Sequence, residues 1–460
     1  MVDRRRGGAA RTRVLISAIL SACVPLAQAS AQTQTAGGLD QLGIRTERWN
    51  LFPSLSLSAI YDDNVFAVPD DSAFLESDVF FVLSPEVTAE ANTRRHALAI
   101  TAGAQIGRYT DLSDQDFNDF DVGLNGRWDI SRTFDLGASF NFARTTEDQS
   151  DPDRTRVAAE LFETTSIKTF SGGLVARQRW QRAFARARVG LRRQTFEELD
   201  GVVFAETSPG SGLFLPTGDT VNVNADRDRT DIPLDFRIGY DLDRDFDIFV
   251  GLAYRIVRFD EPEQFVLRET GFVPVNGQLV ATPVIVDTVD GQSQDFETLG
   301  IQMGTAVDFD RLVTGEFAVG AQRRFEEADS GDDEFAFSFD ADLDWTLSPR
   351  SSLGVSGSQG FEPATGGGSG GSSLVTRLGL DLSYALSRQF SLAGNVGYRR
   401  DNRTGGGRTD DEINAGVSAS YAINRYASLS AGYQFRQRTS TDAAREFDRN
   451  RVFLTVTGRY

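Results

Sequence analysis

The sequence predicts an all-β transmembrane barrel of about eighteen antiparallel strands, of the type found in the outer membrane of Gram-negative bacteria. Apolar and polar residues alternate repeatedly from about residue 51 to residue 460, which is the period of a strand with one apolar face. Short and long connections alternate between these segments. After residue 31, no apolar run reaches the roughly 18 residues of a membrane-spanning helix.

The last segment carries the alternation to the end of the chain. Its apolar parity consists of Val452, Leu454, Val456 and Tyr460, while threonines and an arginine occupy the other parity. A final aromatic residue in the apolar register is typical of the strand that closes an outer-membrane barrel. In such barrels this residue helps the barrel assembly machinery to recognise the chain, so that machinery is an expected partner.

The N-terminus has the features of an export signal. Five arginines precede an apolar run over residues 14–27, and Ala29-Ser30-Ala31 provides small residues at a cleavage site. The predicted organisation is therefore a signal peptide over residues 1–31, a short periplasmic lead-in over 32–50, and a single barrel domain over 51–460.

One alternative concerns processing of this segment. Leu20-Ser21-Ala22-Cys23 resembles a lipoprotein processing site, which would leave Cys23 acylated as the mature N-terminus. The apolar run continues past Cys23 towards the better-placed small residues, so cleavage after Ala31 is expected. The mature protein would then contain no cysteine and no disulfide.

The connections predict the strand number. Eight short connections, nearly all with an arginine, are expected to be tight turns: 92–94, 131–132, 180–182, 243–245, 310–311, 348–350, 387–388 and 424–425. Longer stretches rich in Gly and Asp lie between them and include 62–77, 146–164, 198–228, 261–293, 362–373 and 401–411. Eight short turns and nine long loops predict eighteen strands. Sixteen is the alternative, because the segments nearest residues 165 and 293 are the least regular.

The second face of the strands carries charges of both signs. A cation at the bilayer midplane costs about 2 to 4 kcal/mol, so this face is expected to line a water-filled lumen. The candidate lumen residues lie on two strands: Arg186, Arg188 and Arg192 on one, and Asp340, Asp342 and Asp344 on the other. They either brace the wall through cross-strand ion pairs or form opposed stripes that orient a polar or anionic solute.

These features predict a porin-like channel surrounded by outer-membrane lipid and lipopolysaccharide. A structural or surface-adhesion barrel without transport is the alternative. The formal net charge of −19 makes nucleic acid an unlikely partner. With one histidine and one cysteine, the sequence offers no His/Cys metal site, and the glycine-rich run 366–371 lacks the lysine of a phosphate-binding loop. No catalytic residue, cofactor or metal is therefore predicted.

The segment Tyr61-Asp62-Asp63-Asn64-Val65-Phe66, at the end of the first predicted strand, resembles the beta-barrel porin 2 family. The resemblance implies an outer-membrane, channel-like barrel over the whole mature chain. It also implies an association with exopolysaccharide or capsule production, with polysaccharide-export proteins as partners. From the residues alone, Asp-Asp-Asn is good turn chemistry that ends a strand, and the acidic residues that follow are expected to be ordinarily solvated in a loop. A Ca²⁺ site built from this segment together with Asp70 and Asp71 is a weaker alternative.

Overall fold

The computed structural model of the chain describes residues 43–93, 95–154, 164–207, 211–222, 224–262, 264–275, 278–290, 293–310, 312–326, 333–364, 371–404 and 407–460. The predicted signal peptide and both processing sites lie outside these residues. Within the described part of the chain, no helix is both long and apolar enough to cross a membrane.

The described elements are β-strands with three single turns of 3₁₀ helix. In chain order they are β1 (Ile44–Arg45), β2 (Asn50–Asp62), β3 (Asp78–Asn92), β4 (His96–Tyr109), η1 (Ser113–Gln115), β5 (Phe117–Asp129), β6 (Phe134–Thr146), β7 (Ser166–Arg179), β8 (Ala183–Phe196), β9 (Asp200–Glu206), β10 (Phe214–Asn222), η2 (Ala225–Arg227), β11 (Arg229–Asp241), β12 (Phe246–Phe259), β13 (Gln264–Val275), β14 (Gln278–Asp290), β15 (Phe296–Phe309), β16 (Val313–Glu326), β17 (Glu334–Ser348), β18 (Ser351–Pro363), β19 (Ser372–Ala385), β20 (Phe390–Arg403), β21 (Thr409–Ala422), β22 (Ala427–Ser440), η3 (Ala443–Arg445) and β23 (Phe447–Arg459).

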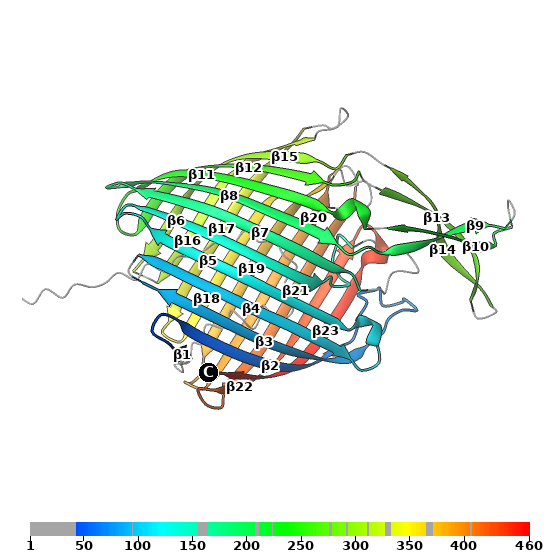
Figure 1. The fold of residues 1–460 in the computed structure, drawn as a ribbon, viewed down its shortest axis with the longest axis horizontal. Coiled ribbons are helices and arrows are strands. Elements are labelled where there is room, and N and C mark those ends of the chain that lie inside the picture. The colour runs from blue at the N-terminus through cyan, green and yellow to red at the C-terminus, as the bar shows by residue number, and fades with distance from the viewer. Residues whose placement is uncertain are drawn as a thin grey trace, which may run out of the picture. The chain divides into compact units, whose positions relative to one another are not determined.

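Eighteen of these strands form a closed antiparallel barrel (Figure 1). They are β2 to β8, β11, β12 and β15 to β23, each paired with the next along the chain, and β23 pairs with β2 to close the wall. The predicted fold class and strand number are confirmed. The alternative of sixteen is wrong, because β7 and β15, the strands in the least regular segments, are both full members of the barrel.

The alternation in the sequence explains the two faces of the wall. On β19, Leu378, Leu380 and Leu382 are each close to half exposed, and they point away from the lumen into the apolar surroundings of the barrel. Arg377 and Asp381 occupy the opposite parity. Closure of the sheet satisfies the backbone donors and acceptors that an open sheet would leave unpaired at its edges in lipid.

All eight predicted short turns join neighbouring barrel strands. Their polar side chains explain the tight reversals, since they accept hydrogen bonds from backbone N–H groups in the turn. Asn424 Oδ1 accepts from Tyr426 N at 2.7 Å and from Ala427 N at 3.0 Å. Ser387 Oγ accepts from Phe390 N at 3.0 Å in the same way. These turns define the periplasmic end of the barrel, and the long connections define the extracellular end.

The two longest connections contain strands, which corrects the prediction that residues 198–228 and 261–293 are loops. β9 and β10 lie between β8 and β11, and β13 and β14 lie between β12 and β15. They form a separate four-stranded sheet in the order β10-β9-β14-β13. The predicted lead-in also contains a strand, since β1 pairs with the start of β2, with Ile44 opposite Leu51.

Candidate functional site

The predicted basic stripe lies on β8, where Arg186 and Arg188 alternate with the exposed side chains of Val189 and Leu191. The cross-strand partner of Arg186 is Arg177 on one side and Arg237 on the other. Three arginines therefore form one row across β7, β8 and β11, and we call Arg177, Arg186 and Arg237 the arginine row. Arg192 lies six residues further along β8, opposite Asp231.

The two outer members of the arginine row have carboxylate partners. Arg177 Nη1 lies 3.2 Å from an oxygen of Asp135, its cross-strand neighbour on β6. Arg237 forms an ion pair with Glu316 of β16, which stands three strands further round the wall. Such a contact is possible only on the concave, lumen side of the barrel. The lumen-facing orientation of this part of β11 follows.

The predicted acidic stripe lies on β17, where Asp340, Asp342 and Asp344 occupy the parity opposite to the exposed Phe335 and Phe337. The cross-strand partner of Asp342 is Glu316, the residue that pairs with Arg237. The acidic stripe therefore lies beside Glu316, which forms an ion pair with Arg237 of the arginine row. Whether either stripe guides a solute stays a prediction.

The largest departure from the sequence interpretation is the connection between β6 and β7, whose first part, residues 147–154, we call the inward loop. Glu147, Gln149, Ser150, Asp151 and Arg154 are all buried. The loop contacts inward-pointing side chains of β20, β22 and β23, which lie between five and eight strands from β6 around the eighteen-stranded wall, with β20 nearly opposite. The inward loop therefore enters the lumen near the extracellular end.

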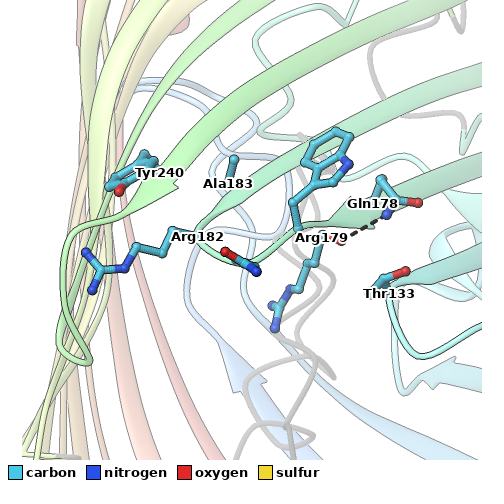
Figure 2. Close-up of a pocket in the computed structure, with 8 residues that line it drawn as sticks. Thr133, Gln178, Arg179, Arg182, Ala183 and Tyr240 are labelled. Atoms are coloured by element: carbon cyan, nitrogen blue, oxygen red, sulfur yellow. Dashed lines mark hydrogen bonds between the residues drawn. The ribbon is translucent and has the colours of Figure 1, made fainter.

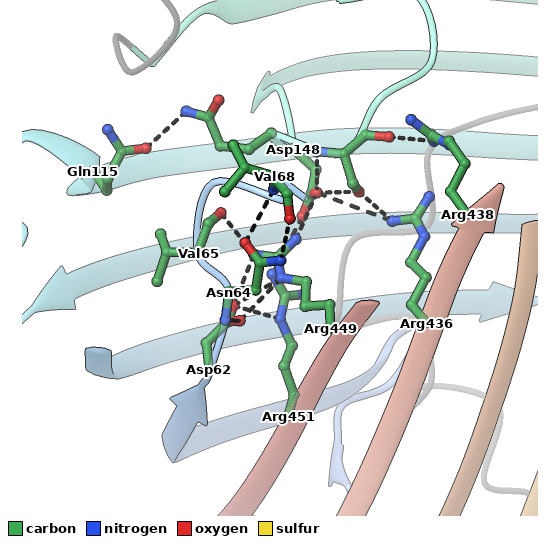
Figure 3. Close-up of polar contacts among 12 residues, drawn as sticks. Asp62, Asn64, Val65, Val68, Gln115, Asp148, Arg436, Arg438, Arg449 and Arg451 are labelled. Atoms are coloured by element: carbon green, nitrogen blue, oxygen red, sulfur yellow. Dashed lines mark hydrogen bonds and ion pairs between the residues drawn. The ribbon is translucent and has the colours of Figure 1, made fainter. Parts of the chain in front are cut away.

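Asp148 is a charged contact of the inward loop with β22 and β23 (Figure 3), and Asp153 forms another with Arg403 of β20, whose Nη2 lies 2.7 Å from Asp153 Oδ1. Asp148 Oδ1 lies 3.0 Å from Arg449 Nη1 and 4.0 Å from Arg436 Nη1, and Asp148 Oδ2 lies 3.5 Å from Arg451 Nη2. Burial by itself would raise the pKa of Asp148, but the three guanidiniums outweigh it and hold the pKa well below its usual range. Asp148 is therefore ionised at neutral pH.

The backbone of the inward loop is held by further arginines. The carbonyl oxygen of Pro152 accepts hydrogen bonds from Arg403 Nη2 at 2.8 Å, Arg408 Nη2 at 2.7 Å and Arg445 Nη1 at 3.1 Å. The carbonyl oxygen of Ser150 accepts from Arg438. Proline cannot donate through its nitrogen, but its carbonyl is a full acceptor, so several guanidiniums can converge on it.

The inward loop is also fixed on its own side of the barrel. The carboxylate of Glu147 is buried between Arg154, at 3.4 Å, and Arg227 of η2, with which it forms an ion pair. Gln149 Nε2 donates to Gln115 Oε1 of η1 at 2.8 Å. The loop is thus tied to η1 and η2 as well as to the arginines of β20, β22 and β23.

The family-like segment at the end of β2 forms the seam of the barrel. Asp62 is fully buried and accepts hydrogen bonds from Arg449 Nη2 and Arg451 Nε of β23, both at 2.7 Å. Asp63 accepts from Asn450 N and Nδ2, both at 2.6 Å. The prediction of turn chemistry that ends a strand is confirmed, because β2 ends at Asp62 and Asp62 Oδ1 accepts from Asn64 N at 3.1 Å. The expectation of an ordinary solvated loop is wrong for Asp62, which is buried where the first barrel strand meets the last.

Asn64 and Tyr61 complete this segment. The Asn64 amide donates to the carbonyl oxygens of Val68 at 2.8 Å and Asp448 at 2.9 Å, and its oxygen accepts from Val68 N at 3.0 Å. Only an amide offers this combination of donor and acceptor, and it braces a turn in which Ala67 has a φ of 49°. Tyr61 points outward and is 45% exposed.

The residues predicted to close the barrel lie along this seam. Val452, Leu454 and Val456 are each about half exposed on the outer face of β23, which pairs with β2 from Asp62 opposite Arg451 to Ser54 opposite Arg459. Tyr460 N donates to Pro53 O at 3.2 Å, and its ring stacks on Tyr426 with centroids 5.8 Å apart. The final aromatic is thus held against both neighbouring strands.

The periplasmic end carries a shallow groove around the turn between β7 and β8 (Figure 2). Its lining includes Trp180, Arg182 and Tyr240, and Gln178 Nε2 donates to Arg179 O at 2.9 Å. Aromatic and basic side chains are usual at the membrane interface of a barrel. The groove contains no convergent set of polar groups, and we assign no function to it.

Sequence reasoning missed Glu316 and the inward loop. Glu316 had a usable signal, because it stands on the parity opposite to Phe317 and Val319. The signal for the inward loop was weaker. It consisted of acidic residues in the loop together with arginines on the inward parity near the extracellular ends of the last strands. Its path into the lumen depends on partners nearly 300 residues away, and no local pattern encodes such contacts.

The family described as "Putative beta-barrel porin 2" matches residues 38–269 and 280–460. A sequence search of curated proteins gives no match.

Similar solved structures include the copper transporter OprC, at 13% identity over 91% of this chain and 82% of that chain, with a TM-score of 0.46. They also include a ferric enterobactin receptor (PfeA) mutant from Pseudomonas aeruginosa, at 8% identity over 89% and 80% with a TM-score of 0.45. OccAB4 from Acinetobacter baumannii matches at 9% identity over 92% and 100% with a TM-score of 0.42. At these identities and scores the similarities carry no argument about function.

The family match covers nearly all of the barrel, from before β1 to the final tyrosine, and the family is one of porins and not of enzymes. The chain therefore belongs to the beta-barrel porin 2 family, which implies an outer-membrane location and a porin-like channel fold.

Proposed function

We propose that the protein is an outer-membrane channel for small hydrophilic solutes, narrowed near its extracellular end by the inward loop. The observation that carries the proposal is the path of that loop from β6 through the lumen to the arginines of β23, β22 and β20, which lie five, six and eight strands from β6 around the wall. A loop held on both sides restricts the cross-section of a barrel that would otherwise be wide.

The composition of the lumen supports a polar cargo. Charges of both signs line the path, with the arginine row and the acidic stripe in the wall and carboxylates and guanidiniums around the inward loop. Fixed charges favour solutes that keep water or hydrogen-bonding groups around them, and they exclude apolar ones. The arrangement offers no assembled nucleophile and base among the described residues, and the family is one of porins.

A second candidate function is secretion of an exopolysaccharide or capsule chain by a Gram-negative cell, with polysaccharide-export proteins as partners. The family resemblance at Tyr61–Phe66 favours it. A polymer would need the inward loop to leave the lumen, whereas a small solute could pass beside it. A structural or adhesion barrel is the third possibility and needs no passage at all.

The test compares the wild-type protein with a variant in which residues 148–153 are replaced by a Gly-Ser segment of the same length. Both are reconstituted in planar bilayers and in liposomes loaded with sugars of graded size. We expect discrete conductance steps and passage of small sugars in the wild type, and larger steps with a higher size limit in the variant. The matched control carries a Gly-Ser replacement of the same length at residues 70–75, which are mostly exposed.

The outcomes separate the candidates. Equal conductance in the wild type and the variant would overturn the role of the inward loop as a constriction. Passage of dextran through the wild type would favour the polymer channel. Absence of conductance in all three proteins, with each correctly folded, would favour the structural barrel.

A further inference from the structure

The arginine row contains one guanidinium that its neighbours do not neutralise. Arg177 and Arg237 pair with Asp135 and Glu316, but Arg186 between them makes no hydrogen bond or ion pair within the part of the chain that the structure describes. Like charges placed directly opposite one another on neighbouring strands destabilise a sheet. The wall therefore keeps an unfavourable concentration of positive charge at this position.

A second guanidinium stands beside it. Arg188 lies two residues further along β8, on the same face, and its cross-strand partner is Asp235. No direct contact joins Arg188 to a carboxylate among the described residues, although Asp235 lies within electrostatic range. Arg186 and Arg188 are thus two adjacent guanidiniums whose N–H groups donate no hydrogen bond to the side chains of the described barrel wall.

Access to these groups is open from the lumen. Both side chains keep part of their surface exposed. The row continues from Arg237 to Gly251 on β12, which has no side chain to project over it. Neighbouring strands are about 4.8 Å apart, so guanidiniums from adjacent strands can contact the two oxygens of one small anion.

We propose that Arg186, together with Arg188 and the flanking members of the arginine row, forms a binding site for the oxyanion of a small solute, with a carboxylate as the preferred group. The inference rests on the proposed channel function and names its substrate class. The planar guanidinium matches a carboxylate in bidentate geometry, which a point charge such as lysine does not. Occupation of the site supplies the counter-charge that the row lacks.

The experiment measures binding of succinate to the purified full-length protein by calorimetry, with sulfate as a second oxyanion and sucrose as a neutral probe. We expect saturable succinate binding at millimolar concentration, weaker sulfate binding and no sucrose binding. Arg186→Gln is expected to weaken succinate binding by about tenfold or more, and Arg186→Lys by less. The matched control is Arg193→Gln on the same strand, because Arg193 pairs with Asp260 on the other face and its loss is expected to leave binding unchanged.

Correct folding of each variant is checked by heat-modifiable migration, and the lysine variant keeps the test valid should the glutamine variant not fold. Wild-type affinity in Arg186→Gln, or equal losses in Arg186→Gln and Arg193→Gln, would overturn the proposal. If the wild type conducts but does not bind succinate, the oxyanion site is rejected and the proposed channel function stands. If the wild type binds succinate but never conducts, the channel function is rejected and the binding site stands.

Discussion

Asp62 and Arg449 join the first strand of the barrel to the last at its extracellular end. The carboxylate is fully buried, and it accepts a hydrogen bond from Arg449 Nη2 at 2.7 Å. The other terminal nitrogen of Arg449 lies 3.0 Å from Asp148 of the inward loop. One guanidinium therefore serves both the closure of the wall and the fixation of the loop inside it.

The first prediction concerns this seam. Asp62→Asn removes the buried carboxylate between Arg449 and Arg451 while keeping the shape of the side chain, and leaves them only Asp148 as counter-charge. Breaking a buried pair costs about 3 to 5 kcal/mol. We expect the variant to lose its folded, fast-migrating form at a lower temperature than the wild type. Asp70→Asn, an exposed residue of the same connection, is the control. Identical melting of the two variants would contradict the role of Asp62.

The second prediction concerns the inward loop. Asp148→Asn keeps the contacts of the loop backbone with Arg438 and Arg403 but removes a charged contact worth about 1.5 to 3 kcal/mol. We expect at least a tenfold increase in the time spent in a higher-conductance level in planar bilayers, with a smaller change in mean conductance than after replacement of residues 148–153. Asp114→Asn, an exposed residue of a neighbouring connection, is expected to behave as the wild type. Unaltered gating in Asp148→Asn would show that the backbone contacts suffice.

The third prediction is the pH dependence of this contact. The pKa of Asp148 is lowered in the folded protein, so its ion pairs contribute above the ordinary aspartate pKa of about 3.9 and are lost only as the pH falls through the lower, folded value. The occupancy of the higher-conductance level, which reports release of the loop, is therefore expected to stay constant from neutral pH down to roughly pH 4 and to rise only in stronger acid. A transition centred near pH 5 would contradict this assignment.

The fold could be predicted because the alternation of apolar and polar residues within each barrel strand indicates which face meets lipid and which meets the lumen. Leu378, Leu380 and Leu382 need only their own alternation to be assigned to the lipid face, and Asn424 needs only its own side chain to form a turn. The extra sheet formed by β9, β10, β13 and β14 was not predicted, because the long connections were assigned as loops from their Gly and Asp content. The dipeptide Asn276-Gly277, between two runs rich in Val and Thr, was a usable hairpin signal.

The candidate site could be predicted only in part. Parity places Arg186 and Asp340 on the lumen side, but it does not reveal that Arg186 stands between two other arginines, since that depends on the register of three strands. The pairing of Asp62 with Arg449 joins residues 387 positions apart in the chain. Such contacts follow from closure of the whole barrel, so no local pattern could have indicated them.

The last prediction concerns ion preference. Replacing Arg186, Arg188 and Arg192 by Ser removes positive charge from the lumen wall, and replacing Asp340, Asp342 and Asp344 by Asn removes negative charge from the other stripe. We expect the reversal potential in a potassium chloride gradient to shift towards cation preference in the first variant and towards anion preference in the second. Because Arg192 lies apart from the arginine row, opposite Asp231, its single replacement should contribute least to the first shift. Arg193→Ser, on the other face of β8, is the control. An unchanged reversal potential in both triple variants, when they conduct and fold correctly, would mean that the two stripes brace the wall and do not line the path of the ions.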